Sequence, residues 1–205
     1  MPTLFLIIVL VLSVVIHEVA HGYAAAFLGD PTARLAGRLT LNPFKHLDPI
    51  GSVILPGILI LLGGFVIGWA KPVPYNPYNL KAGRWGPAAV AAAGPGTNLL
   101  LALVFGLISR GLATAGAFPL IASLCQLVVL INVMLAIFNL IPVPPLDGSK
   151  ILFAVLPYRW RAVESFLTRY QFWLVLFLLL LIANSRWLDV LVSSLVKLFA
   201  GATVF

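Results

Sequence analysis

Residues 3–28 read TLFLIIVLVLSVVIHEVAHGYAAAFL, an apolar stretch long enough to cross a bilayer as one helix. Only three of these residues, His17, Glu18 and His21, carry acidic or imidazole side chains. Such groups are costly inside a membrane helix unless they face a polar cavity or have partners. The stretch therefore predicts a membrane helix with a functional polar cluster in its C-terminal half.

The composition extends this interpretation to the whole chain of 205 residues, of which 61% are hydrophobic and only 9% charged. Soluble domains average about 25% charged residues, so the composition excludes an ordinary water-soluble domain. A net charge of +7 would suggest nucleic-acid binding in a soluble protein. Here the basic residues separate apolar segments, where they orient a protein in its membrane. We therefore expect the lipid bilayer, and no nucleic acid, as a partner.

Six apolar segments follow one another, at residues 3–28, 53–69, 86–109, 119–141, 171–184 and 188–205. Proline and glycine interrupt the short segment 53–69, so a re-entrant or interfacial element fits it as well as a crossing. We predict an all-α, polytopic bundle with about five membrane-spanning helices plus this segment near 53–69. A single domain would occupy residues 1–205, with a motif-bearing core at about 3–155 and C-terminal helices at 156–205.

Two connecting segments have weaker signals. Residues 33–41 partly alternate in polarity around Gly37, a weak strand pattern, and the prolines of residues 71–77 favour an extended chain. Either segment could hold an extended peptide by strand addition, or both could be plain connectors.

His17 and His21 are four positions apart, so on a helix both imidazoles project from one face and can reach one zinc ion. Glu18 follows the first histidine and is placed to take a proton from a water held by that ion, as in the HExxH motif. A neutral packing cluster of the same side chains is the alternative. The location of these three side chains inside an apolar helix favours the metal site over this alternative.

A catalytic zinc usually has three protein ligands and one open position. Candidates for the third ligand are Asp30, His46, Asp48, Asp147, Glu164 and Asp189. Asp147 is favoured because it follows an apolar helix broken by prolines and precedes Gly148, which permits a tight turn. Alternatively, Asp147 only caps the next helix. His46 and Asp48, in a turn-rich loop, are rival ligands.

Three motifs, in order along the chain, resemble those of the site-2 protease family of intramembrane metalloproteases. The first is HExxH at residues 17–21. Residues 93–98, Ala-Gly-Pro-Gly-Thr-Asn, resemble the family's A-G-P-x-x-N, and residues 139–148 resemble its N-x-x-P-x-P-x-L-D-G. The resemblance covers about residues 10–155 and indicates a minimal form without the PDZ or CBS modules of some relatives.

The resemblance implies a zinc metalloendopeptidase that binds one Zn2+ per chain through His17, His21 and Asp147, with Glu18 as general base. It also implies that Asn139 helps to hold the substrate or the transition-state oxyanion. We expect Asn98 of the middle motif to contribute to helix packing. The implied substrates are membrane-spanning proteins; the natural substrate, the regulator and the oligomeric state are not determined.

The zinc site constrains the topology. His17 and His21 lie toward the C-terminal half of their helix, and Asp147 lies just past the C-terminal end of its own. These two helices must run in the same direction to meet at one ion, so an odd number of crossings must separate them. Segment 53–69 should therefore not cross fully.

The basic residues favour the same topology. If the first helix runs from outside to inside, only Arg110 and Arg186 are external, and Lys197 lies within the last segment. The basic residues that this orientation places in the cytoplasm are Arg34, Arg38, Lys45, Lys71, Lys81, Arg84, Lys150, Arg159, Arg161 and Arg169. This is a positive-inside bias. The sequence thus predicts a multi-pass protein of the cell membrane, with its active site toward the cytoplasm and cleavage near that face.

Two other functions stay open. A metal-ion transporter would also place histidine and aspartate within the membrane, but the other apolar segments offer few polar residues for a pathway. A catalytically inactive homologue that binds membrane helices would keep the fold, although the intact Glu18 argues against this.

Overall fold

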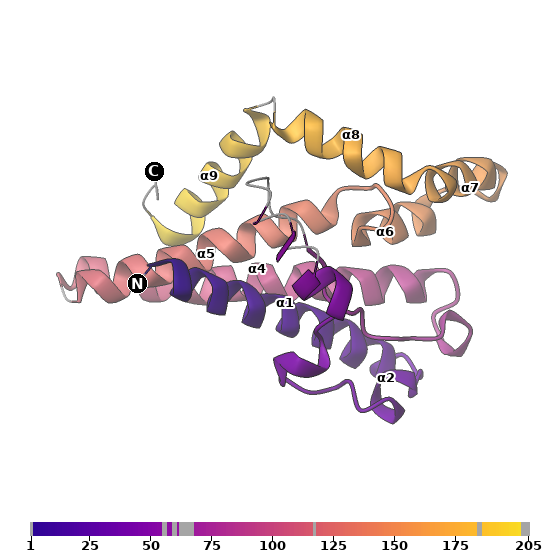
Figure 1. Cartoon of the computed structure of the whole chain (residues 1–205), viewed down its shortest axis with the longest axis horizontal. Helices are drawn as coiled ribbons and strands as arrows, with labels where there is room; N and C mark the ends of the chain where they lie inside the picture. The colour runs from indigo at the N-terminus through magenta and orange to yellow at the C-terminus, as the bar shows by residue number, and fades with distance from the viewer. Residues whose placement is uncertain are drawn as a thin grey trace.

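Three long apolar helices form the centre of the protein: α1 (Pro2–Phe27), α4 (Trp85–Thr114) and α5 (Pro119–Leu140). The computed structural model describes residues 2–54, 57–58, 61, 68–116, 118–183 and 186–201. Helices α1 and α5 run in the same direction, and α4 packs against both in the opposite direction (Figure 1). Because α1 and α5 are parallel, their C-terminal ends lie at the same end of the bundle.

Shorter helices complete the described part of the chain. They are α2 (Thr32–Leu35), η1 (Pro43–Lys45), η2 (Pro49–Ile54), η3 (Pro77–Asn79), α6 (Asp147–Val155), η4 (Tyr158–Trp160), α7 (Arg161–Arg169), α8 (Gln171–Ala183) and α9 (Trp187–Ala200). Helix α9 packs on α4 and α5 through a buried apolar cluster that includes Val196, Val133 and Ala102. The prediction of an all-α bundle agrees with this architecture.

The predicted number of about five spans is supported only in part. Among the described residues, α1, α4 and α5 are long and apolar enough to cross a membrane. A fourth span is possible if residues 158–169 and 171–182, which are bent by 73° relative to each other, count as one. Helices α8 and α9 have 13 and 14 residues. At 1.5 Å per residue each reaches only about 20 Å, short of the ~30 Å hydrocarbon core.

The prediction for residues 53–69 falls mainly on residues outside the described ranges, which include only 53–54, 57–58, 61 and 68–69 of this segment. In the part of the chain that the structure does describe, α4 is the one long apolar helix between α1 and α5.

The weak strand prediction for residues 33–41 is wrong. Residues 32–35 form helix α2, and the described residues contain no strand. Gly37 ends this helix with a φ of 63°, while Gly37 N–H donates to the Arg34 carbonyl and Arg38 N–H to the Ala33 carbonyl. These two bonds form a Schellman motif, for which a glycine in the left-handed region is well suited. The glycine at the centre of the alternating pattern is therefore a helix stop.

The end of α1 is tied to a later loop by a buried carboxylate. Asp30 is fully buried, and its oxygens accept hydrogen bonds from Thr32 N and Oγ1, Asn76 N and Asn79 Nδ2. Burial alone would raise the pKa of Asp30, but these hydrogen bonds outweigh it and lower the pKa below the usual 3.8. Asp30 thus fixes the loop of residues 72–79 beside the C-terminal half of α1.

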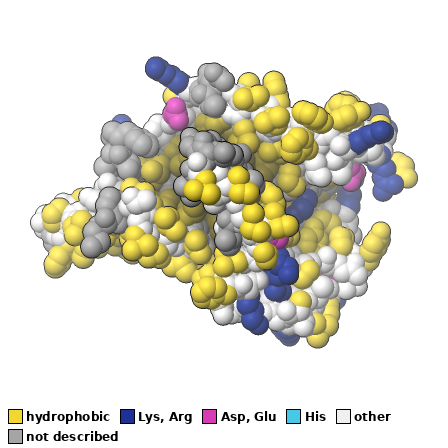
Figure 2. Space-filling view, in the orientation of Figure 1, with side chains coloured by type: hydrophobic (Ala, Val, Ile, Leu, Met, Phe, Trp, Pro, Cys, Tyr) yellow, Lys and Arg dark blue, Asp and Glu magenta, His cyan; other side chains and the backbone are white. Residues whose placement is uncertain are grey.

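The surface divides into an apolar body and a basic end. Lysine and arginine side chains gather at the end that carries α2, α6 and α7, whereas hydrophobic side chains cover much of the bundle (Figure 2). Large apolar side chains on the long helices are strongly exposed, such as Leu4 at 62% and Leu107 at 59%. This distribution suits helices that face lipid along their length and water or headgroups at one end.

Candidate metal centre

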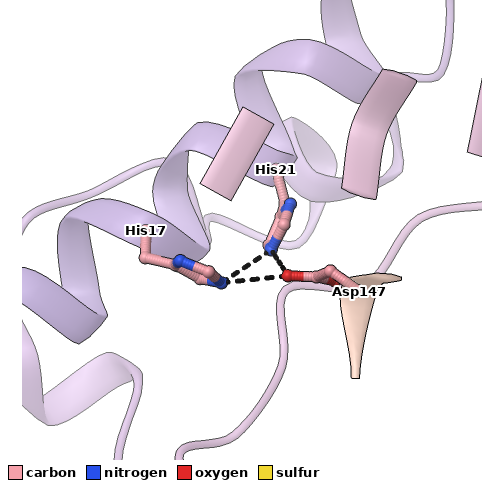
Figure 3. Close-up of side chains that lie close together, drawn as sticks. All are labelled: His17, His21 and Asp147. Carbon is pink, nitrogen blue, oxygen red and sulfur yellow. Dashed lines mark hydrogen bonds and ion pairs between the residues drawn. The ribbon is translucent and has the colours of Figure 1, made fainter. Parts of the chain in front are cut away.

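His17, His21 and Asp147 meet at one point. The two histidines lie one turn apart on α1, and Asp147 is the first residue of α6, just after the turn that follows α5. The Nε2 atoms of the histidines are 3.0 Å apart, and Asp147 Oδ2 lies 3.2 Å from His17 Nε2 and 3.1 Å from His21 Nε2 (Figure 3). All three side chains are buried, at 6–8% exposure.

The spacing of these atoms fits a zinc ion. With Zn–N and Zn–O bonds of about 2.0–2.1 Å, two ligands of a tetrahedral zinc lie about 3.3 Å apart. The measured separations of 3.0–3.2 Å are close to that value. Two imidazole nitrogens and one carboxylate oxygen are a donor set that catalytic zinc sites use, and they leave a fourth position open. Within the described residues this is the group of histidine, cysteine and acidic side chains able to hold a metal.

The Nδ1 atoms of both histidines already have hydrogen-bond partners. His17 Nδ1 lies 2.6 Å from Asn98 Oδ1, and His21 Nδ1 lies 2.7 Å from the Val90 carbonyl oxygen. Both oxygens only accept hydrogen bonds, so each Nδ1 carries the proton and each Nε2 of a neutral ring presents a lone pair. Two lone pairs and a carboxylate oxygen at this distance repel one another unless a cation lies among them. The hydrogen bonds around the site therefore favour a bound metal.

A chain of amide groups fixes the orientation of Asn98. Asn132 Nδ2 donates to the Val128 carbonyl at 2.9 Å and contacts Ser13 Oγ at 3.0 Å, so Asn132 Oδ1 faces Asn98. Asn98 Nδ2 donates to that oxygen at 2.8 Å, which turns Asn98 Oδ1 toward His17. Because the Val128 carbonyl can only accept a hydrogen bond, every bond in this series is donated in the same direction, from His17 through Asn98 and Asn132 to Val128.

These contacts were not anticipated from the sequence. Asn98 was expected to serve helix packing, and it does bridge α4 and α5, but it also holds a histidine of the metal centre. Asn132 belongs to none of the three motifs, although an amide within the apolar helix α5 is costly without partners. That cost is the one signal in the sequence that could have indicated it.

Gly94 provides the space for both histidines. A Cβ atom at this position of α4 would lie 2.5 Å from His21 Cε1 and 2.6 Å from His17 Nε2. Real Cβ atoms do not approach other atoms so closely, so any larger residue would push the imidazoles away. Gly94 thus explains how α4 comes near enough for Asn98 and Val90 to reach the rings.

Asp147 is positioned by the close approach of α6 to the end of α5. A Cβ on Gly148 would lie 2.2 Å from the Leu140 carbonyl oxygen, so only glycine fits there. Burial disfavours the charged form of Asp147, but hydrogen bonds from His17 and His21, whose Nε2 atoms carry protons when no cation lies among them, and the Lys150 ammonium, 3.4 Å from Oδ1, outweigh it and lower the pKa of Asp147. The carboxylate is therefore ionised, as a zinc ligand must be.

Glu18 and Asn139 have different surroundings. Glu18 is half-buried, and its Oε2 accepts a hydrogen bond from the backbone N–H of Val73 at 2.9 Å. Asn139 Nδ2 donates to the Leu135 carbonyl of its own helix, and the described residues give this side chain no other hydrogen bond. The role of Asn139 toward the substrate stays a prediction.

The rival ligands lie elsewhere. His46 is buried, and its Nε2 donates to the Thr40 carbonyl at 2.8 Å. Asp48 accepts from the backbone N–H groups of Ile50 and Gly51 and so caps η2. Neither belongs to the group that could hold a metal.

Comparison with known proteins identifies the family. Residues 5–119 and 112–183 match the model of Peptidase family M50. YwhC of Bacillus subtilis (strain 168), whose name assigns it provisionally to the zinc metalloproteases, is 40% identical over 96% of this chain and 91% of its own length. No solved structure matches the chain significantly.

More distant relatives agree. Rip2 of Mycolicibacterium smegmatis, also named provisionally as a zinc metalloprotease, is 32% identical over 86% of this chain and 66% of its own length. Zinc metalloprotease MJ0392 of Methanocaldococcus jannaschii is 27% identical over 78% of this chain and 37% of its own length. The matched family, these relatives and the His–His–Asp group agree with one another: this chain belongs to peptidase family M50, the site-2 protease family, and is a zinc metalloprotease.

Proposed function

We propose that this metalloprotease cuts membrane-spanning protein substrates near the cytoplasmic face, using one zinc ion held by His17, His21 and Asp147. The observation that carries the proposal is the position of the metal group within the bundle. Its two histidines belong to a helix long and apolar enough to cross a membrane, and all three ligands are buried. A protease with such a site is suited to substrates that reach it from the bilayer.

A zinc ion held by these side chains would supply Lewis-acid chemistry, lowering the pKa of a water and polarising the scissile carbonyl. Glu18 takes the proton from the attacking water and passes it to the leaving amine. The Val73 N–H holds Glu18 Oε2 at 2.9 Å. The other oxygen, Oε1, has no hydrogen bond among the described residues and is free to carry the proton.

The cytoplasmic position is supported by charge. The C-terminal ends of α1 and α5 lie at the basic end of the bundle (Figures 1 and 2). Lysine and arginine are enriched on the cytoplasmic side of membrane proteins. The zinc group, near those two helix ends, would then lie toward the cytoplasm.

Strand addition gains little support as the way a substrate is held. Residues 33–35 belong to helix α2, and Pro72 and Pro74 have no N–H to donate. Other backbone groups of that extended segment are already engaged, since Val73 N–H binds Glu18 and Arg38 Nη2 binds the Lys71 carbonyl at 2.7 Å. A substrate would need to displace these contacts before it could use the same edge.

The test combines metal content with cleavage. Wild type, Glu18→Gln, His21→Ala and Asp147→Ala would be purified in detergent, assayed for zinc under a competing chelator, and reconstituted with a panel of tagged single-span membrane proteins. We expect Glu18→Gln to keep zinc and lose cleavage by at least ~10²-fold, since it removes the general base. The two ligand variants should lose both.

Three results would contradict the proposal. Full zinc occupancy in Asp147→Ala would show that Asp147 is not the third ligand. Undiminished cleavage by Glu18→Gln would show that Glu18 is not the general base. Zinc flux into the vesicles by the wild type, without cleavage of any panel member, would indicate a transporter instead.

A further inference from the structure

A cavity lies at the basic end of the bundle, and none of the three residues of the metal group lines it. It has a volume of about 350 Å³ and is lined by side chains from the N-terminal end of α4, from α6 and from the η4–α7 region. Its charged side chains are Arg84, Lys150, Arg161 and Glu164, a net excess of two positive charges. Three cations from separate segments thus face one hollow of a size that small ligands occupy.

Aromatic rings, rather than carboxylates, hold the two arginines. The Arg84 guanidinium lies 5.3 Å from the centre of the Trp85 ring, and that of Arg161 lies 4.4 Å from the centre of the Tyr158 ring. Among the described residues neither arginine forms an ion pair, although Glu164 lines the same cavity. Lys150 differs, because its ammonium is 3.4 Å from Asp147 Oδ1.

Positive side chains that are fixed in place but not neutralised favour an anion with several oxygens. A guanidinium offers paired N–H donors that match a phosphate, and it loses little entropy when its side chain is already stacked. Arg84 and Arg161, which both line the cavity, therefore have the chemistry that suits a phosphate group.

The surroundings indicate a lipid as the source of that phosphate. The wall also contains apolar side chains, among them Phe153 and Leu156, which a free anion would not use. Tyr158 is 76% and Trp160 49% exposed beside the cavity, as aromatic residues are at the level of lipid headgroups. Basic pockets between membrane helices on the cytoplasmic side bind anionic headgroups. We propose that this cavity binds the headgroup phosphate of an anionic phospholipid.

The experiment measures lipid binding to the full chain in detergent. Short-chain phosphatidylglycerol would be titrated and the bound lipid counted by native mass spectrometry, with short-chain phosphatidylcholine and inorganic phosphate as separate arms. The test variant is Arg84→Gln/Arg161→Gln. The matched control is Arg159→Gln/Arg169→Gln, which removes the same charge from exposed positions outside the cavity. The thermal unfolding midpoint of each variant would show that it is folded.

We expect one tightly held phosphatidylglycerol per wild-type chain, weaker binding of phosphatidylcholine, and little binding of inorganic phosphate. The test variant should bind phosphatidylglycerol at least about tenfold more weakly, since it loses two charged hydrogen-bond donors. The control should match the wild type. Equal losses in both variants would overturn the proposal in favour of general surface charge. Inorganic phosphate that binds as tightly as the lipid would overturn the lipid assignment.

Discussion

The Oδ2 atom of Asp147 lies 3.2 Å from Nε2 of His17, although 130 residues separate the two along the chain. Two close approaches make this possible. Gly94 lets α4 approach the histidine rings of α1, and Gly148 lets α6 approach the end of α5. The metal group therefore depends on packing around two glycines as much as on its three ligands.

Replacement of Gly94 by alanine should weaken zinc binding. The added methyl group would meet both imidazoles at 2.5–2.6 Å, so the rings must shift from their present positions. We expect zinc affinity, measured by competition with a chelator, to fall by at least about tenfold, the scale seen when the surroundings of a metal ligand are disturbed.

Gly96 offers the matched control, because a Cβ there would have no neighbour within 4 Å. Gly96→Ala should leave zinc affinity unchanged and stabilise α4 slightly, by up to about 1 kcal/mol, since alanine is the better helix former. Equal losses of zinc in the two variants would contradict the role assigned to Gly94.

The amide chain predicts a non-additive pair of substitutions. Asn98→Ala removes the acceptor of His17 Nδ1 and should lower zinc affinity by about 10–100-fold. Asn132→Ala should have a smaller effect, because it reaches the ring only through Asn98. The double variant should bind zinc about as weakly as Asn98→Ala alone.

Asn139→Ala is the control for this series, since its side chain bonds only within its own helix among the described residues. It should keep zinc affinity, whether or not cleavage falls. Strictly additive losses in the double variant would show that Asn132 acts by another route.

Asp30 should make the stability of the protein depend on acidic pH. Its pKa is lowered on folding from the usual 3.8, so its ionised form stabilises the folded state. That contribution is fully present above about pH 4 and is lost as the pH falls through the lower folded-state value. Asp30→Asn should reduce the free energy of unfolding near neutral pH by about 1–3 kcal/mol, because the amide turns an N–H group toward backbone or side-chain donors.

Denaturation of the detergent-solubilised protein at several pH values would measure this effect. Asp189→Asn, at an exposed position, is the control and should change little. If Asp30→Asn showed the same fall in stability below pH 4 as the wild type, another carboxylate would be responsible.

The packing of α9 can be tested at Gly106 of α4. A Cβ there would lie 2.6 Å from the Phe199 carbonyl oxygen, so Gly106→Ala should separate the two helices and destabilise the protein by about 1–3 kcal/mol. A Cβ on Gly111, five residues on, would have no neighbour within 4 Å, and Gly111→Ala should be neutral or slightly stabilising. Thermal unfolding compares the two, and equal stabilities would show that α9 does not pack here.

Local sequence patterns predicted those features of the site that lie within a single helix. The apolar run around His17 and His21 indicated a membrane helix, and their four-residue spacing placed both rings on one face, because a helix repeats every 3.6 residues. The same local logic failed at Gly37, where an alternating pattern suggested a strand. The Schellman bonds around that glycine are short-range, yet the alternation of side chains does not reveal them.

The sequence by itself thus indicated the membrane class, the histidine pair and the carboxylate of Glu18 beside it, since each follows from composition or from spacing within a turn of helix. The tertiary structure brings Asp147, which the sequence already favoured over His46 and Asp48, to the two histidines, and it alone decided that Asn132 and Asn98 support His17. It also showed that, in the described part of the chain, α1, α4 and α5 are long enough to span a membrane. These features depend on contacts between helices distant along the chain, and such contacts follow from packing rather than from local periodicity.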